Sequence, residues 1–221
     1  NSMWSIEPQP GRAVIVAALS NGVCTLRGFL PSEDCMHTVN AMRALGIKIE
    51  QPEPTVLVVH GKRRVLTTPN QEINCGNSGT TMRLLAGLLA GQKFESRLVA
   101  GPGLSKRPMD RVIAPLCEMG ASVVAEGPDG TPPLRIHGGS LRGIQYRPSV
   151  ASAQVKGALL LAGLFAKGKT TVEQTVPTRN HMEKMLNYFL VRSTKEDDGS
   201  VSVFGEQIPE DAVAFNGDDG R

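Results

Sequence analysis

The most polar segment that leads into an apolar helix runs from 74 to 83, with the sequence Asn-Cys-Gly-Asn-Ser-Gly-Thr-Thr-Met-Arg. The free N–H groups and the positive dipole end of such a helix start can bind an anion. The glycines would let a ligand approach the backbone closely. Simple N-capping by Asn77 or Ser78 explains the same residue types, so the segment leaves both interpretations open.

A second segment of this kind, Ser-Val-Ala-Ser-Ala-Gln at 149–154, precedes another apolar helix. Two similar helix starts on one side of a protein favour a shared anion site more than either does alone. Arginines follow these segments, and guanidinium groups suit bidentate contacts to phosphate and carboxylate. They are Arg83, Arg107 and Arg179. Any one of them taken alone is more often a solvated surface charge, and we interpret 62–64 (Lys-Arg-Arg) in that way, as a hairpin tip.

The sequence lacks the patterns of several other chemistries. No Gly-Lys-Ser/Thr follows the glycines at 76–79, no GxGxxG follows a strand, and no hydrolase motif is present. The cysteines form no CxxC pair and the histidines lack metal-ligand spacing, so we expect no metal and no cofactor. The scattered cysteines are typical of free thiols in a reducing cytoplasm. The residues concerned are Cys24, Cys35, Cys75, Cys117, His37, His60, His137 and His181.

The composition narrows the class of protein. The 221 residues are 40% hydrophobic and 20% charged, which excludes a wholly disordered chain. The net charge of +3 suits small anions as well as nucleic acid. With only 1 Trp, 2 Tyr and 6 Phe, however, a base-stacking nucleic-acid surface is not expected. The longest apolar runs are too short to span a bilayer, so we expect no membrane partner and a cytoplasmic location.

One pattern of elements occurs three times along the chain. An apolar helix ended by glycine is followed by a short strand, a second helix with one charged face, and two more strands. The predicted apolar helices lie within 12–22, 80–91 and 154–168, the strands after them at 23–27, 94–99 and 170–174, and the second helices at 32–45, 109–119 and 180–190. The closing strands are predicted at 48–50 with 56–60, 122–125 with 134–137, and 191–194 with 200–204, and extra leading strands at 72–74 and 144–147.

The repeated unit is therefore βαβαββ, which predicts an α/β (α+β) domain of three units. Because the first helix of each unit is apolar nearly all round, it belongs inside, and the domain should be pseudo-three-fold with buried central helices. An open α/β sheet would need continuous apolar strands, whereas these are short and half polar. We expect an altered segment at 1–11, a domain at 12–205 with units at 12–71, 72–140 and 141–205, and a frayed acidic tail at 206–221.

Four motifs closely resemble the first half of the 5-enolpyruvylshikimate-3-phosphate (EPSP) synthase family. They are Asn-Ser-Gly-Thr-Thr-Met-Arg at 77–83, Lys-Arg-Pro-Met at 106–109, Ser-Ala-Gln at 152–154 and Pro-Thr-Arg at 177–179. The resemblance extends from Arg12 to Gly205. It implies the family fold, which has two domains of three such units joined by a hinge.

The resemblance also implies an activity and a set of binding residues. The family transfers the enolpyruvyl group of phosphoenolpyruvate to shikimate 3-phosphate through a tetrahedral intermediate, without metal or cofactor. Glyphosate occupies the phosphoenolpyruvate position. The residues implied for shikimate 3-phosphate are Arg12, Ser152, Ala153, Gln154 and Arg179, and those implied for phosphoenolpyruvate or glyphosate are Asn77, Gly79, Arg107 and Gln154. Both substrates are anions, so preorganised cations suit the reaction.

The chain departs from the family in two places. The family opens with Lys-Ser-x-Ser-His-Arg, whereas Glu7 and Pro8 stand at the Lys and first Ser positions here and only Arg12 is kept. A carboxylate beside anionic substrates is repulsive. The resemblance further implies a missing C-terminal domain that would carry the catalytic Asp, Lys and Glu. We therefore expect a monomer that is inactive alone, without a complete acid–base pair of its own, and whose partner is that domain.

Two other functions remain open on these residues. The related enzymes that act on UDP-N-acetylglucosamine carry a reactive Cys where this chain has Pro102, which argues against that substrate. The second alternative is a non-catalytic paralogue or partner domain that keeps the fold but no longer binds the substrate. The replaced residues Glu7 and Pro8 favour that alternative, and a ligand titration would separate it from a substrate-binding domain.

Overall fold

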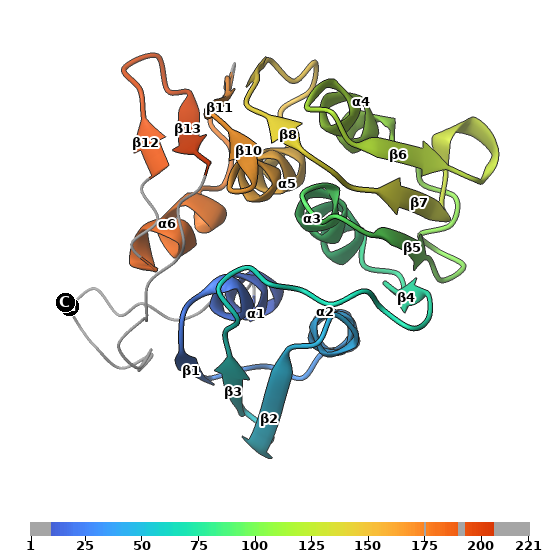
Figure 1. Cartoon of the computed structure of the whole chain (residues 1–221), viewed down its shortest axis with the longest axis vertical. Coiled ribbons are helices and arrows are strands. Elements are labelled where there is room, and N and C mark those ends of the chain that lie inside the picture. The colour runs from blue at the N-terminus through green and yellow to red at the C-terminus, as the bar shows by residue number, and fades with distance from the viewer. Residues whose placement is uncertain (1–9, 175, 190–192, 206–221) are drawn as a thin grey trace.

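Three buried helices form the centre of the protein. The computed structural model describes residues 10–174, 176–189 and 193–205, so the segment at 1–9, the tail predicted at 206–221 and two residues of the strand predicted at 191–194 lie outside it. Figure 1 looks along the three central helices, α1 (Pro10–Leu19), α3 (Gly79–Ala90) and α5 (Ala153–Gly163). Nearly every residue of these helices is buried, as their all-round apolar sequences predict.

Outside this centre lie the second helices of the three units, α2 (Glu33–Ala44), α4 (Asp110–Glu118) and α6 (His181–Tyr188). Ser32 caps α2 by accepting a hydrogen bond from the Cys35 N–H, as expected of a serine at that position. The charged face of the helix predicted at 180–190 includes Glu183 and was expected to face water, which is wrong for Glu183. Glu183 is only 8% exposed and pairs with Lys156 of α5.

The strands form an outer layer of small sheets (Figure 1). The first sheet has the order β1-β3-β2, with β1 Val23–Arg27, β2 Lys48–Glu53 and β3 Val56–His60, all antiparallel. The second has the order β4-β5-β7-β6, with β4 Ile73–Asn74, β5 Glu95–Val99, β6 Ser122–Ala125 and β7 Leu134–His137. The third has the order β12-β13-β11-β9, with β9 Gln145–Tyr146, β11 Lys169–Val172, β12 Ser193–Lys195 and β13 Val201–Phe204.

Both four-stranded sheets use one arrangement. In each, the leading strand pairs in parallel with the strand after the buried helix, and that strand pairs antiparallel with the last strand of the unit. A short parallel pair, β8 (Leu141–Arg142) with β10 (Ala166–Lys167), and a 3-10 turn at Pro128–Gly130 complete the described elements. The predicted α/β fold with repeated βαβαββ units and buried central helices is confirmed.

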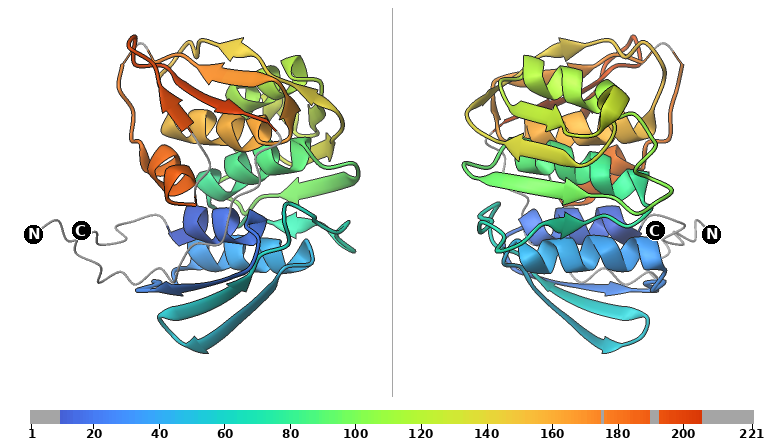
Figure 2. Two further views of the ribbon diagram at one scale, coloured as in Figure 1. Left: turned by 60° about the vertical axis from the view of Figure 1, so that its left-hand side comes forward. Right: turned by 90° about the vertical axis from the view of Figure 1, so that its right-hand side faces the viewer.

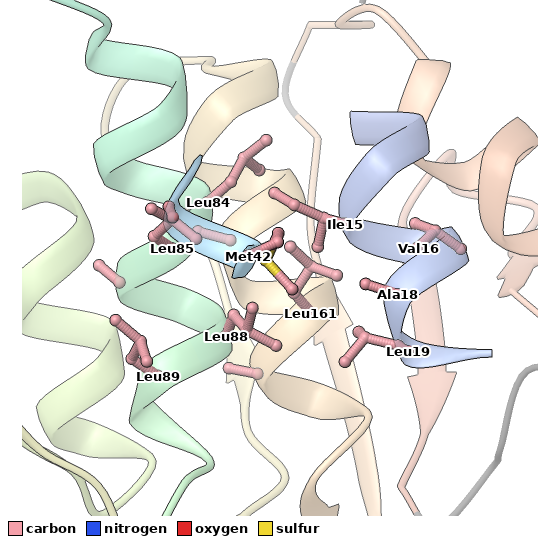
Figure 3. Packing of buried hydrophobic residues seen from close by; sticks show 14 of the residues in the cluster. Ile15, Val16, Ala18, Leu19, Met42, Leu84, Leu85, Leu88, Leu89 and Leu161 are labelled. Carbon is pink, nitrogen blue, oxygen red and sulfur yellow. The ribbon is translucent and has the colours of Figure 1, made fainter. Parts of the chain in front are cut away.

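Backbone contact between α3 and α5 is especially close. A Cβ atom added at Gly87 of α3 would lie 2.1 Å from the carbonyl oxygen of Ala158 in α5. Leucines of both helices, among them Leu88 and Leu161, lie in one buried cluster with residues of α1 such as Ile15, as Figure 3 shows. Within the described residues, none of the helices has the length and apolar character needed to cross a membrane.

The interpretation of 62–64 as a hairpin tip is wrong, and for Arg64 the expectation of a solvated charge is wrong as well. These residues follow β3 instead of connecting two paired strands. The Arg64 guanidinium donates to the carbonyl oxygen of Leu164 and lies 5.5 Å from the centroid of the Phe165 ring. Arg64 therefore ties the first unit to the end of α5, a contact that residue type alone did not indicate.

Candidate anion-binding site

The starts of the central helices open at one end of the protein. Figure 2 shows α1, α3 and α5 running side by side. Ser78 caps α3 by accepting from the Thr81 N–H at 3.2 Å, and Ser152 caps α5 by accepting from the Val155 N–H at 3.3 Å. The capping interpretation is thus confirmed for Ser78 and not for Asn77. Because these caps satisfy only one N–H each, further backbone donors remain at both starts.

Side chains in the first turns of α3 and α5 are hydrogen-bonded to one another. Arg83 Nη1 donates to Gln154 Oε1 at 2.6 Å, and Gln154 Nε2 donates to Thr80 Oγ1 at 2.7 Å. A Cβ at Gly79 would lie 2.7 Å from Arg83 Nη1, so the glycine leaves room for this guanidinium. The structure therefore brings Gly79 and Gln154 together through Arg83, which was one of the candidate arginines although the family resemblance assigned it no ligand.

A cavity of about 200 Å³ lies between the starts of α1, α2 and α3. The residues that line it include several serines and threonines, one cation, Arg12, and one acidic residue, Asp34. Thr81 Oγ1 lies 2.8 Å from Thr38 Oγ1 and donates to Ser78 Oγ at 2.9 Å. The lining is Pro10, Gly11, Arg12, Ser32, Asp34, Cys35, Thr38, Ser78, Thr80, Thr81 and Leu84. Such a wall suits a hydroxylated anion.

Arg12 is a buried cation at the edge of this cavity. It is 4% exposed, and its Nε has no hydrogen-bond partner. Burial lowers the pKa of Arg12, the nearby Glu183 carboxylate raises it, and Arg179 lowers it. His181 lies in the same field: burial lowers its pKa, and Arg12, Arg179 and then Lys184 act in the same direction, against Glu183. Cations outnumber carboxylates here, which favours an anionic ligand.

A second group of cations surrounds Arg83. Burial lowers the pKa of Arg83, and the like charges of Arg107 and Arg111 add to this shift. Asn77 Oδ1 accepts from the N–H groups of Gly103 at 2.8 Å and Leu104 at 3.2 Å. Asn77 therefore holds the loop that leads to Arg107, which is a different task from capping. Arg111, the second residue of α4, was not predicted as part of the site, and its position offered no sequence signal.

The remaining predicted residues lie at the start of α5 and before α6. Ala153 is the first residue of α5, half-buried next to its cap Ser152. Arg179 is exposed two residues before α6 and within electrostatic range of Arg12. In the part of the chain that the structure describes, no group of three or more His, Cys, Asp or Glu side chains is arranged to hold a metal ion.

Sequence reasoning missed the buried pair of Lys156 and Glu183. Lys156 Nζ donates to Glu183 Oε1 at 2.5 Å, and the lysine is 2% exposed. The signal was a lysine within an apolar helix, because a buried ammonium needs a partner. Glu183 Oε2 is buried with no hydrogen-bond partner. The Glu183 carboxylate raises the pKa of Arg12 and that of His181, against the effect of burial.

Comparison with known proteins supports one family. The family model described as EPSP synthase (3-phosphoshikimate 1-carboxyvinyltransferase) matches residues 9–219. The 3-phosphoshikimate 1-carboxyvinyltransferase of Xanthomonas campestris pv. campestris (strain 8004) is 51% identical over 180 residues, which are 80% of this chain and 41% of that protein. The same enzyme of Acidithiobacillus ferrooxidans is 49% identical over 189 residues, 82% of this chain and 43% of that protein.

A solved structure of EPSP synthase from Acinetobacter baumannii superimposes with a TM-score of 0.88 at 42% identity, covering 91% of this chain and 45% of that chain. The chain thus spans less than half the length of the relatives it matches.

Proposed function

This chain belongs to the EPSP synthase family, and from that premise we propose that it forms the shikimate 3-phosphate-binding part of a 3-phosphoshikimate 1-carboxyvinyltransferase. That activity transfers the enolpyruvyl group of phosphoenolpyruvate to shikimate 3-phosphate. One observation carries the proposal: Arg83 and Gln154 join the starts of α3 and α5, and the start of α1 carries Arg12, whose buried Nε lacks a hydrogen-bond partner. An anionic ligand with several hydroxyl groups would accept hydrogen bonds from Arg12 Nε and from the N–H groups that the caps leave unpaired at the helix starts.

The proposed roles follow the chemistry of each side chain. Arg12 and Arg179 supply positive charge for shikimate 3-phosphate, and Ser152 and Gln154 supply hydrogen bonds at the start of α5. Ala153 lies between the last two and offers only its backbone. For phosphoenolpyruvate, the proposed contacts are the exposed Arg107, placed by the loop that Asn77 holds, and the start of α3 at Gly79. Gln154 is shared by the two ligands.

We assign no acid–base pair among the described residues at this end of the protein. They supply cations and hydroxyl groups, which bind and stabilise charge, whereas the reaction also needs positioned proton transfer. We therefore propose that the isolated chain binds substrate without turning it over. A phosphate-release assay with both substrates should show no product. Turnover by chain freed of host enzyme would refute this proposal.

Calorimetry with shikimate 3-phosphate tests the binding. We expect weak binding, because Glu7 and Pro8 replace a lysine and a serine, and each lost charge-assisted contact weakens affinity about 10- to 100-fold. Arg179→Ala should abolish what remains. Arg142→Ala is the matched control, since it removes the same charge from β8, which pairs with the strand that follows the far end of α5. If the chain is folded but binds no shikimate 3-phosphate, the alternative of a non-catalytic partner domain that no longer binds substrate is favoured.

A further inference from the structure

Lys156 is a buried cation on an otherwise apolar helix. The other buried residues of α5 are aliphatic or glycine, and the start of the helix is the proposed shikimate 3-phosphate site. The Lys156 ammonium donates to Glu183 Oε1 at 2.5 Å and to Gln174 Oε1 at 3.0 Å. Apolar side chains of similar volume usually stabilise a core at least as well as a buried ion pair does. The stability of the fold therefore leaves this pair unexplained.

The two acceptors of Lys156 lie on either side of Arg179 in the chain. Gln174 comes shortly after β11, and Glu183 lies in the first turn of α6. The same Gln174 oxygen accepts from Thr178, from its N–H at 3.2 Å and its hydroxyl at 2.9 Å. The Lys156 ammonium thus contacts both ends of the segment that presents Arg179. Thr178, the residue just before Arg179, donates to the same Gln174 side-chain amide.

This network borders the proposed site. Ser152, Lys156, Gln174 and Thr178 line one small hollow beside the start of α5. Gln174 is itself anchored, because its Nε2 donates to the carbonyl oxygen of Gly199 at 2.8 Å. The side chains that hold the Arg179 segment are therefore fixed to the body of the third unit. An exposed arginine on a segment outside any helix or strand would otherwise lose much side-chain and backbone entropy when it binds a ligand.

We propose that Lys156, Gln174 and Glu183 are positioning residues that hold the Arg179 segment beside the start of α5 and so raise the affinity of the site for its anionic ligand. The inference rests on the proposed anion-binding role of Arg179. None of the three side chains needs to touch the ligand. Their contribution is preorganisation, which lowers the entropic cost of placing Arg179.

Two variants of the chain test the inference. Lys156→Met/Glu183→Leu removes both buried charges at once, so no unpaired charge is left inside. Gln174→Met keeps the ion pair and removes the acceptor that Thr178 and Lys156 share, together with the hydrogen bond to the Gly199 carbonyl. It serves if the double variant does not fold. The control is Lys169→Met/Glu196→Leu, which removes an exposed pair of 2.7 Å from the same unit.

The first measurement is amide hydrogen exchange, which needs no ligand. Gln174→Met removes the acceptor of the Thr178 N–H, and the double variant removes the ammonium that holds this acceptor in place. The Thr178 amide should therefore exchange at least about tenfold faster in both variants, since a tenfold change corresponds to about one such bond. Amides of α3 and α5 and the Tm should stay as in the control. Exchange at Thr178 equal to that of the control would overturn the proposal. So would faster exchange throughout the chain, because the role would then be only structural.

The second measurement is calorimetry with shikimate 3-phosphate. The affinity should fall about tenfold in both variants and not in the control. If only charge mattered, Gln174→Met would leave the affinity unchanged, because this substitution removes no charge. Unchanged affinity in both variants overturns the proposal. If the parent chain binds no shikimate 3-phosphate, the proposed function fails, and the exchange at Thr178 still decides whether the network holds the Arg179 segment.

Discussion

Gly87→Ala is expected to separate the two helices that build the candidate site. The added Cβ would lie 2.1 Å from the carbonyl oxygen of Ala158 and 2.7 Å from its carbonyl carbon. Ordinary van der Waals contact begins at 3.4 Å. Because both atoms belong to the backbone of α5, no side-chain rotation relieves the clash, and α3 and α5 must move apart.

Two effects of this substitution oppose each other. Alanine in place of glycine inside a helix stabilises by about 0.5–1 kcal/mol through propensity. Overpacking against a backbone atom typically costs about 1–3 kcal/mol or more. The short distance places this site at the upper end, so we expect a net loss of about 2 kcal/mol, which lowers the Tm by about 4–8 °C in a domain of this size.

Gly157→Ala is the matched control, since Gly157 is a helical glycine at the same interface. Its Cβ would meet Leu84 Cδ2 at 3.0 Å, the far end of a side chain that can turn away. We expect a change within about 1 kcal/mol there. Thermal unfolding followed by circular dichroism compares the two variants. A Tm of Gly87→Ala at or above that of Gly157→Ala would refute the close contact between α3 and α5.

Three further outcomes follow from caps, protonation and burial. Ser78→Ala and Ser152→Ala should each destabilise by about 1 kcal/mol in denaturant unfolding, because each removes an N-cap, and equal stability of parent and variants would contradict the caps. The pKa of His181 lies below its usual 6.5 because of burial and then of Arg12, Arg179 and Lys184, so the folded state binds fewer protons than the unfolded state. Stability should therefore fall as the pH drops from about 6.5 through the folded pKa, and His181→Gln should remove that part of the pH dependence of the Tm. Burial raises the pKa of Cys75 to about 12, so native protein treated with iodoacetamide near pH 8 should be modified at the exposed Cys117 and not at Cys75, as peptide mass spectrometry would report.

The fold was predictable from the sequence because its elements carry local signals. The strands at Val23–Arg27 and Leu134–His137 have the predicted bounds, since alternation and flanking glycines mark them. The helix predicted within 154–168 ends earlier, at Gly163, and the short strand β10 follows it. That strand pairs with β8, which lies more than twenty positions earlier in the chain, so the residues next to β10 carry no signal of the pairing. Apolar residues alone do not distinguish a helix end from a buried two-residue strand.

The candidate site was predictable only in part. The helix starts were visible in the sequence, because caps and glycines are short-range features. The bond between Arg83 and Gln154 spans 71 positions, and the pair of Lys156 and Glu183 spans 27. Which charged side chain meets which depends on the packing of helices against one another. Composition and spacing indicate that such partners are needed but do not identify them.

A titration of isotope-labelled chain with shikimate 3-phosphate, followed by amide NMR, tests the central claim most directly, because NMR also detects weak binding. If the helix starts form the anion site, the shifts should concentrate at 78–83, 152–155 and 178–181, with Arg12 included and the outer sheets unchanged. Inorganic sulfate at equal ionic strength is the control for a general charge effect. Shifts spread over the outer strands, or none in a folded chain, would contradict the account.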